Sequence, residues 1–367
     1  MILGGGVIGL TTAYYLASEG ASVTVLDRND FGQKASWAGA GIVPPGNPTG
    51  AKSPIERMRA VSSAAFPGLS ASLRDETGID NGYLVCGGIE LPDDGGLPTE
   101  AWRDEGIAFE ALDHAGLKRA EPEISPVFAS GYLLPGMAQV RNPRHIKALI
   151  AACSERAVGL NPGCLALGFL KAGDRITGVE TEQGRMTAGQ YLIATGAWTD
   201  ELVAQLGWKP GIAPVRGQIA LVNSGHASIR PIILLGKRYL VPRPDGRVLA
   251  GATEEDVGFD ARPTAGGIAG LLAFAEQLIP SLRDATMERC WAGLRPGSPD
   301  GQPFLGLVPG YSNLYVSAGH FRAGIQLSPA TGMAMMEMML GLATSVPIEA
   351  FRPDRPMALP AETAFRS

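Results

Sequence analysis

The chain opens with MILGGGVIGL, in which Gly4, Gly6 and Gly9 form the pattern G-x-G-x-x-G. The next segment, LTTAYYLASEG, has apolar residues at helical spacing and ends on a glycine that can cap a helix. SVTVLD then has the composition of a strand that ends on Asp27. A glycine loop followed by a helix, a strand and an acid is typical of a unit that binds a dinucleotide. There the glycines allow a tight turn, close approach to a pyrophosphate and close helix–strand packing, and the acid accepts a hydrogen bond from a ribose hydroxyl.

The glycine motif alone leaves three questions open. A Gly-rich turn of an unrelated α/β protein is the alternative to a dinucleotide site, and the helix, strand and acid around the motif argue against it. Asp27 disfavours NADP, whose 2′-phosphate requires a cation, yet Arg28 lies next to it. Only Met1, Ile2 and Leu3 precede the loop, so its strand is short. We therefore expect further residues upstream in the physical protein, or a start codon chosen too late.

The composition fits a soluble globular protein with room for two domains, since the chain has 367 residues, of which 45% are apolar and 18% charged. A net charge of −5 gives no reason to expect a nucleic acid or an anionic membrane as partner. No apolar run is long enough to span a membrane, and no secretory signal is visible. The four cysteines form no CxxC pair and the four histidines are scattered, so we expect reduced thiols in a cytoplasmic protein and no metal site.

Three later stretches are suited to contact the rest of a cofactor. KASWAGAGIVPPG is rich in small residues, which let a backbone lie flat against a ring system, and Ser36 can bind a phosphate; a flexible loop is the alternative interpretation. YLIATG has the apolar run of a buried strand that ends near Gly196. NLYVSAGHFRAG predicts a strand over 314–318 and a helix that begins at Gly324. The glycine loop does not separate FAD from NAD, and these stretches favour FAD.

Seven segments in sequence order carry a resemblance to a known family: GGGVIG, ASWAGAGI, IATGAW, PVRGQ, RYLVPRPDGRVLAGATEEDVGFD, WAGLRPGSPDGQPFLG and AGHFRAGIQLSPATG. On these segments the chain resembles the D-amino-acid oxidase family of FAD-dependent amine oxidoreductases. Within that family it is most similar to the glycine oxidase branch, which supplies thiazole synthesis for thiamine. The pieces WAGLRP and GHFRAGI are the most specific, and the others occur more widely among relatives.

The resemblance implies an α/β fold, in which a Rossmann-like FAD-binding domain is joined to an α+β substrate-binding domain with a mixed antiparallel sheet. Both domains would be discontinuous. We expect residues 1–45, 140–212 and 296–367 in the FAD-binding domain, and residues 46–139 and 213–295 in the substrate-binding domain. The cofactor signals lie at both ends and in the middle of the sequence, which independently favours such a split.

The resemblance also implies a substrate site and catalytic centre built from Tyr239, Arg295 and Arg322. In the family, the positions that match Tyr239 and Arg295 hold the substrate carboxylate, a task suited to a planar guanidinium, and the position of Arg322 lies near substrate and flavin. From spacing alone, each arginine would instead be expected in a surface ion pair, and Tyr239 in the core or at a rim. Ile42 and Glu254 stand at positions that differ among relatives and that can determine the size of the substrate accepted.

A larger set of residues is assigned to FAD by the resemblance, from the glycine loop, the small-residue stretch and the later strand ends. Among them, His320 is expected to serve structural packing. Gly297 and Ser298 occupy the stretch in which some relatives attach flavin to a cysteine, so non-covalent FAD is expected. The set comprises Gly4, Gly6, Val7, Ile8, Gly9, Asp27, Arg28, Ala35, Ser36, Gly39, Ala40, Gly41, Ile42, Leu167, Thr195, Gly196, Trp198, Arg295, His320, Phe321, Arg322, Ala323, Gly324 and Ile325.

The implied reaction is oxidative deamination of glycine or another small amine, such as sarcosine or D-alanine. A hydride passes from Cα to flavin N5, water converts the imine into oxo acid and ammonia, and molecular oxygen takes the electrons to give hydrogen peroxide. No catalytic base is required, because the amine lone pair can drive the transfer. The expected partners are the substrate and oxygen, with a homo-oligomer as an open possibility.

Other functions stay open at this point. A quinone-linked D-amino-acid dehydrogenase would need an apolar membrane-facing patch, and the sequence shows none. A sarcosine-oxidase-like enzyme is the other alternative of the same class. An FAD-binding module that modifies RNA would need a basic surface, which a pI of about 5.5 disfavours. A flavin scaffold without catalysis is the remaining class.

Overall fold

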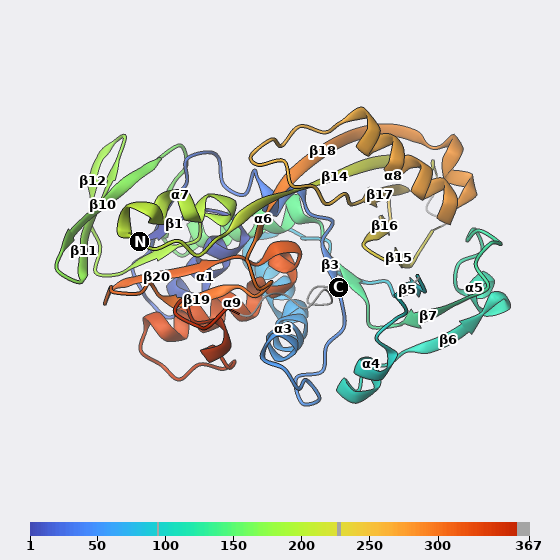
Figure 1. Ribbon diagram of the computed structural model, residues 1–367, viewed down its shortest axis with the longest axis horizontal. Helices are drawn as coiled ribbons and strands as arrows, with labels where there is room; N and C mark the ends of the chain where they lie inside the picture. The colour runs from blue at the N-terminus through green and yellow to red at the C-terminus, as the bar shows by residue number, and fades with distance from the viewer. Residues whose placement is uncertain (94, 226–228, 358–367) are drawn as a thin grey trace.

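Two large β-sheets form the framework of the protein, and they lie at opposite ends of the long axis (Figure 1). The computed structural model describes residues 1–93, 95–225 and 229–357. The α/β class expected from the sequence is confirmed, with helices packed on one sheet and a mixed, mostly antiparallel second sheet.

The first sheet has six strands and brings both chain ends and the middle of the sequence together. Four of its five pairings are parallel, and only β19 is antiparallel to its neighbour. The predicted strands at the glycine loop, before Asp27, in YLIATG and over 314–318 all lie in this sheet. In order across the sheet, the strands are β19 (Phe304–Leu307), β20 (Leu314–Ala318), β13 (Tyr191–Ile193), β1 (Ile2–Leu3), β2 (Thr24–Leu26) and β9 (Gly159–Asn161).

Strand β1 is only two residues long, yet it lies in the interior of the sheet. Ile2 pairs with Leu192 on one side and with Val25 on the other. Successive residues of a strand point to opposite faces, so Ile2 belongs to the core under the helices and Leu3 to the core on the other face. Because both faces are covered, even a short strand is fully buried, which explains the unbroken apolar sequence MIL.

Three helices cover one face of this sheet, and a fourth, α3 (Pro54–Thr77), packs on two of them, α6 and α9. The three are α1 (Val7–Ser18), α6 (Asn142–Glu155) and α9 (Gly324–Met339), and all four helices share one hydrophobic core. The predicted helix after the glycine loop ends at Ser18, and Gly20 follows with a φ of +80° that turns the chain away. The other face is covered by a small antiparallel sheet of β10 (Ala166–Ala172), β11 (Arg175–Thr181) and β12 (Gly184–Met186).

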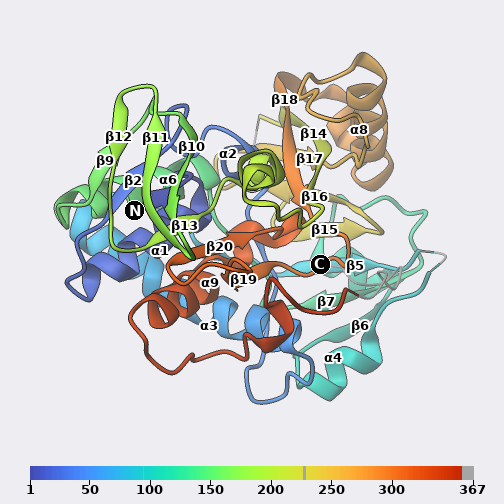
Figure 2. The same ribbon diagram turned by 60° about the vertical axis from the view of Figure 1, so that its left-hand side comes forward.

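The second sheet has eight strands and a single parallel pair, between β15 and β5. Helix α8 (Ala265–Leu278) packs on β14 and β17, as the turned view shows (Figure 2). The long pair β14–β18 runs from this sheet towards the first one. In order, the strands are β18 (Thr286–Gly297), β14 (Ala213–Asn223), β17 (Arg247–Gly251), β16 (Arg238–Pro242), β15 (Ile232–Leu235), β5 (Gly88–Leu91), β7 (Ser130–Leu134) and β6 (Glu110–Asp113).

The short elements between the sheets come from segments that are far apart in sequence. A three-stranded sheet joins β3 (Ile42–Val43), β8 (Ala138–Gln139) and β4 (Leu84–Val85). Helix α2 (Ala35–Ala38) contacts both β18 and α6, while α4 (Thr99–Glu105) and α5 (His114–Ala120) flank the outer edge of the second sheet. Within the described ranges, no helix is both long and apolar enough to cross a bilayer.

The domain boundaries predicted from the sequence remain a proposal. Their support is that the six-stranded sheet draws on residues 2–26, 159–193 and 304–318, and the eight-stranded sheet on residues 88–134 and 213–297. Helix α3, from the segment assigned to the substrate-binding domain, packs on α6 and α9. The last residues of the proposed FAD-binding domain, 358–367, lie outside the described residues.

Gly332 lies where α9 packs closely on α1. A Cβ atom added there would lie 2.9 Å from side-chain atoms of Thr11 and Tyr15. We expect Gly332→Val to lower stability by about 1–3 kcal/mol, because an overpacked core forces its neighbours apart. The control Gly68→Val lies in α3, where nothing stands within 4 Å, and it should be near neutral. Thermal unfolding of the holoprotein tests this; equal loss in both variants would contradict it.

Candidate active site

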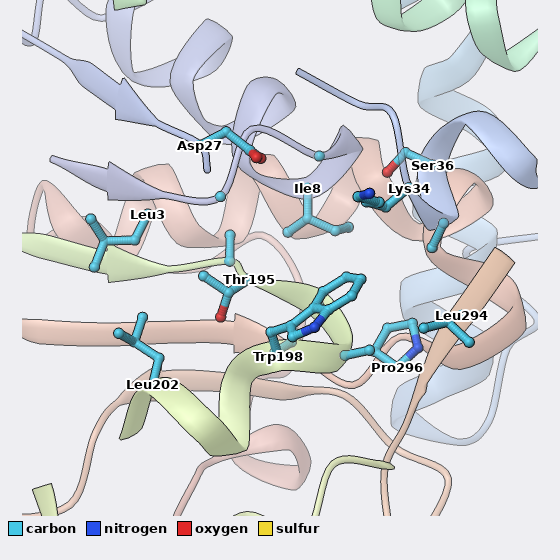
Figure 3. A pocket seen from close by; sticks show the side chains of 18 of the residues that line it. Leu3, Ile8, Asp27, Lys34, Ser36, Thr195, Trp198, Leu202, Leu294 and Pro296 are labelled. Carbon is cyan, nitrogen blue, oxygen red and sulfur yellow. The ribbon is translucent and has the colours of Figure 1, made fainter. Parts of the chain in front are cut away.

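A cavity of about 340 Å³ lies beside the ends of β1, β2, β13 and β20. The glycine loop and α2 line one side, and the turn after β13 lines the other, so that Asp27 and Ser36 face Thr195 and Trp198 across the space (Figure 3). The far end is formed by β18, from Leu294 to Pro296, and by the turn after β20. The cavity therefore collects most of the segments that the sequence assigned to FAD.

The three glycines of the opening motif do different work. At Gly4, φ is +108° and an added Cβ atom would lie 2.3 Å from the carbonyl oxygen of Ala194. At Gly9, an added Cβ atom would lie 2.0 Å from the carbonyl oxygen of Gly4, so Gly9 lines no cavity and serves the packing of α1 on the loop. Gly6 has an ordinary φ of −77°, and only Ser36 Oγ stands near its missing Cβ, at 3.1 Å. Gly6 is thus the position where the absent side chain leaves space in the cavity.

The start of α1 presents backbone donors to this space. The N–H of Val7 donates to Ser36 Oγ at 2.9 Å. The N–H groups of Gly6 and Ile8, which both line the cavity, have no hydrogen-bond acceptor in the part of the chain that the structure describes. Unpaired N–H groups at a helix N-terminus, together with the helix dipole, favour an anion such as a pyrophosphate.

Asp27 stands at the end of β2, beside the glycine loop. Its Oδ2 accepts from the N–H of Gly5 at 2.8 Å and its Oδ1 from the N–H of Asn29 at 2.9 Å. Burial raises the pKa of Asp27, and these two donors oppose the rise. The carboxylate is held in place by backbone groups, and each oxygen keeps a lone pair with which to accept a bond from a hydroxyl.

An aromatic wall closes the cavity opposite Asp27. The Arg28 guanidinium lies 3.9 Å from the ring centroid of Trp198, and Phe259 stacks on Trp198 at 5.5 Å. Leu167, more than half exposed, lies at the opening. Phe259 comes from the connection between β17 and α8, so a segment next to the second sheet contacts Trp198 in the cavity wall.

The small-residue stretch is held at regular intervals, which excludes the flexible-loop interpretation. Alternate backbone carbonyls along it accept hydrogen bonds from side chains of three other segments. The bonds run from Asn142 Nδ2 to Ser36 at 2.9 Å, from Trp291 Nε1 to Ala38 at 2.9 Å, and from the buried Arg243 Nη2 to Ala40 at 2.8 Å. The backbone from 36 to 40 is thereby presented to the cavity in a fixed path.

A second chamber of about 130 Å³ adjoins the first cavity. The two share Ala35, Gly39, Arg295, Arg322 and Ile325, so they meet at these residues. The remaining predicted residues divide between them. Those in the smaller chamber are Ala40, Gly41, Ile42, Tyr239 and Ala323, and those in the larger cavity are Gly196, His320, Phe321 and Gly324.

Arg295 is a cation without a carboxylate partner in the part of the chain that the structure describes. Its Nη1 donates to the carbonyl oxygen of Thr253 at 3.0 Å, and no acid among the described residues lies within ion-pair distance of it. The guanidinium lies against Gly217, where an added Cβ atom would come within 2.2 Å of Nη2. Burial lowers the pKa of Arg295, and Tyr239 opposes this. The surface ion pair considered from spacing alone is therefore wrong for Arg295.

Tyr239 lies beside Arg295, with its ring against Gly251. Burial raises the pKa of the Tyr239 phenol, and the positive charges of Arg295 and Arg322 only partly oppose the rise. Tyr239 is therefore a neutral O–H donor at ordinary pH. Tyr239 lies on β16.

Arg322 differs from Arg295 in having an acid partner. Its Nη2 donates to Glu254 Oε2, and the other oxygen of Glu254 lies 3.4 Å from Lys237 Nζ. Burial lowers the pKa of Arg322. Among the described residues that line the two spaces, Glu254 is absent, so it lies behind Arg322 as its counter-ion.

His320 is placed as the sequence suggested, in the core at the end of the larger cavity. Its Nε2 lies 3.1 Å from Thr331 Oγ1, and burial lowers its pKa to about 3. A ring that stays neutral to such low pH does not carry protons in the working range.

Several lining residues were not predicted from sequence. Gly217 and Gly293 lie in quoted segments, and their role is visible only once Arg295 and Ala38 are seen against them. Arg59, on α3, lines the smaller chamber, and its helical sequence context carried no signal. The other unforeseen members are Leu3, Leu26, Asn29, Lys34, Ala38, Pro44, Ile55, Cys164, Leu165, Ala166, Ala194, Ala197, Glu201, Leu202, Gln205, Ile219, Leu234, Gly236, Lys237, Arg238, Leu294, Pro296, Ser317, Ala318 and Gln326.

Comparison with known proteins agrees with this geometry. Residues 1–338 match the family described as DAO, FAD dependent oxidoreductase. The chain belongs to this family. It is 36% identical to the glycine oxidase of Pseudomonas putida over 343 residues, which cover 93% of this chain and 94% of that protein.

Two further relatives extend the comparison. The bifunctional protein ThiO/ThiG of Synechocystis is 34% identical over 366 residues, covering 97% of this chain and 53% of that protein. The crystal structure of glycine oxidase from Geobacillus kaustophilus superposes with a TM-score of 0.92 at 30% identity, covering 97% and 98% of the two chains. The family resemblance and the FAD-binding fold expected from the sequence are confirmed. The protein is an FAD-dependent oxidoreductase.

The larger cavity has the features that FAD requires. Unpaired N–H groups at the start of α1, the space beside Gly6 and the carboxylate of Asp27 suit a pyrophosphate and a ribose. Of the four cysteines, only Cys164 lines the cavity, and its N–H bonds the carbonyl of Asp27, at the end away from Arg295. The thiol nearest the cofactor therefore lies on the ribose side, in keeping with non-covalent FAD.

The space beside Gly6 can be tested directly. We expect Gly6→Val to yield folded protein with little FAD, because the backbone accepts a side chain there while the branched group intrudes where the pyrophosphate must approach. The control is Gly189→Val, at an exposed site with nothing within 4 Å. The ratio of flavin to protein absorbance gives occupancy, and circular dichroism reports the fold. Full FAD content in folded Gly6→Val would show that the loop does not hold the cofactor.

Proposed function

We propose that this enzyme oxidatively deaminates glycine and related small amines, including sarcosine and D-alanine, with FAD and molecular oxygen. The products are the oxo acid, ammonia or the corresponding amine, and hydrogen peroxide. The observation that carries the proposal is Arg295, a partly buried cation that has no carboxylate partner among the described residues. It lies in a small chamber that adjoins the cofactor cavity. The names of the relatives, glycine oxidases among them, favour an oxidase over a quinone-linked dehydrogenase.

Arg295 and Tyr239 are the proposed carboxylate site. A guanidinium can give a carboxylate two parallel hydrogen bonds, and the neutral Tyr239 hydroxyl can give a third. Isolated burial of a charge is costly, so a cation that lacks an acid partner gains most from an anionic ligand. Two donors on one carboxylate also fix the direction in which Cα points, which is the orientation that the reaction needs.

Arg322 and the residues around it line the remaining sides of the proposed substrate site. Arg322, Ala323 and Ile325 lie at the start of α9, where the two spaces meet, and Ile42 faces the smaller chamber. With Glu254 as counter-ion, Arg322 carries less free charge than Arg295. We infer that Arg322 positions the substrate, and that the small chamber and Ile42 limit its size.

FAD, when bound, supplies the acceptor for the hydride that leaves Cα. The chain's own contribution is to hold the cofactor through the start of α1, Ser36 and Asp27, and to exclude a titrating base from the chamber. Neither Tyr239 nor His320 changes protonation near neutral pH. The substrate amine must therefore arrive at the reaction with its lone pair free. A role in thiazole synthesis for thiamine follows from the resemblance. The cytoplasmic location expected from the cysteine content stays a prediction, and a homo-oligomer stays an open possibility.

Replacing Arg295 tests the proposed site. In Arg295→Met we expect folded, FAD-loaded protein whose glycine binding is weakened about 10- to 100-fold, the value of one hydrogen bond to a charged group, with a slower reduction rate as orientation is lost. Arg295→Lys should recover only part, since it lacks the planar fork. Arg289→Met, an exposed position on the same strand, is the control. Anaerobic stopped-flow reduction gives affinity and rate; wild-type values in Arg295→Met would place the carboxylate elsewhere.

The pH dependence tests the absence of a base. The rate of flavin reduction by glycine should rise with pH until the substrate ammonium has lost its proton, because only the free amine has a lone pair. The phenol of Tyr239 has a raised pKa and His320 a pKa of about 3, so neither should add a step near neutral pH. Tyr239→Phe should bind glycine more weakly and keep the same rise. A profile that Tyr239→Phe flattens would identify the phenol as a proton acceptor.

A further inference from the structure

The smaller chamber contains more positive charge than one carboxylate needs. Five basic side chains line it: Arg59, Lys237, Arg238, Arg295 and Arg322. No acidic side chain of the described residues lines it. An anion in this chamber would therefore meet cations from several elements at once.

Four of these cations already have an interaction or an assigned ligand. Arg322 and Lys237 share Glu254. Arg238 is exposed and lies 5.7 Å from the ring of Phe274. Arg295 is the proposed partner of the substrate carboxylate. Arg59 is the cation that remains.

Arg59 lines the chamber from α3, whereas Arg295 lines it from β18. Within the described ranges Arg59 forms no hydrogen bond and no ion pair. Burial lowers its pKa, and the more distant charges of Glu105 and Glu56 oppose this. Both acids bond elsewhere, since Glu56 caps α3 at Ser53 and Glu105 accepts from the N–H of Asn47 at 2.9 Å.

A free guanidinium facing a cavity is costly unless a ligand pairs with it. The chamber of about 130 Å³ is many times larger than the space one water needs, so it can hold a ligand of several heavy atoms. Arg295 on β18 and Arg59 on α3 are thus two guanidinium groups in one enclosed space, with one carboxylate assigned between them.

We propose that Arg59 binds a second anionic group on the substrate, so that amino acids with two carboxylates are substrates of the same site. This inference rests on the proposed amine oxidation and narrows its substrate class. The second carboxylate can be linked through nitrogen, as in iminodiacetate, or through Cα, as in D-aspartate.

The overall reaction is unchanged in its balance. With iminodiacetate, the bond from Cα to hydrogen breaks and the amine proton is lost. Water adds to the resulting imine, and glyoxylate and glycine are released. Molecular oxygen takes the two electrons and two protons to give hydrogen peroxide. D-aspartate would give oxaloacetate, ammonia and hydrogen peroxide in the same way.

The test compares wild type, Arg59→Met and the control Arg57→Met, an exposed residue on α3 that lines neither space. Anaerobic reduction is measured with glycine, iminodiacetate and D-aspartate. We expect at least one diacid to have a dissociation constant at or below that of glycine. In Arg59→Met, the ratio of reduction rate to dissociation constant for that diacid, relative to glycine, should fall about 10- to 100-fold, the value of one hydrogen bond to a charged group. Arg57→Met should keep the wild-type ratio.

A binding measurement separates this inference from the proposed function. Diglycolate, an ether with two carboxylates, and methoxyacetate, with one, contain no amine and are titrated against the flavin spectrum. We expect wild type to bind diglycolate at least tenfold more tightly, and Arg59→Met to lose this preference. If glycine reduces the flavin while diacids do not, or if Arg59→Met leaves the ratio unchanged, the inference is overturned and the proposed function stands. If no amine reduces the flavin, the proposed function fails, and the diglycolate preference decides for or against Arg59.

Discussion

The rest of the structure depends on a contact between two backbones. Gly4 turns so close to the carbonyl of Ala194 that no side chain fits between them, and Gly9 approaches the carbonyl of Gly4 in the same way. These contacts seat the start of α1 on a strand that lies nearly two hundred residues later in sequence. A two-residue strand is enough because neighbours on both sides and cores on both faces hold it. Close packing therefore fixes the position of the cofactor loop more than the number of paired residues in β1 does.

Where local chemistry decides the structure, the sequence was informative. The glycine pattern, the strand over 314–318 and the helix that begins at Gly324 were predicted with the observed bounds, because turn geometry and apolar periodicity are local properties. Long-range placements were not accessible. Nothing near Arg59 in sequence indicates that α3 turns it towards β18, and nothing near Glu254 indicates that it pairs with Arg322. Such contacts arise from the order in which distant strands pair, which a single sequence does not display.

Charge in the chamber is arranged unevenly, and the arrangement has a physical meaning. Arg322 is compensated by Glu254, whereas Arg295 and Arg59 are left without acids in the described structure. A compensated arginine holds its place whether or not a ligand is present. An uncompensated one destabilises the empty site and is stabilised by the ligand's own charge. The chamber thus combines one fixed wall with positions whose energy depends on the substrate.

The interleaving of the six-stranded sheet has a consequence for how the chain is made. Strand β1 is synthesised long before its neighbour β13 and the next strand, β20. The cofactor sheet cannot close, and α9 cannot cover α1, until almost the whole chain is available. Sheets that join such distant segments fold slowly and leave apolar surface exposed while they wait. The apolar MIL segment is therefore a candidate chaperone-binding segment during synthesis. FAD can bind only to a nearly complete chain.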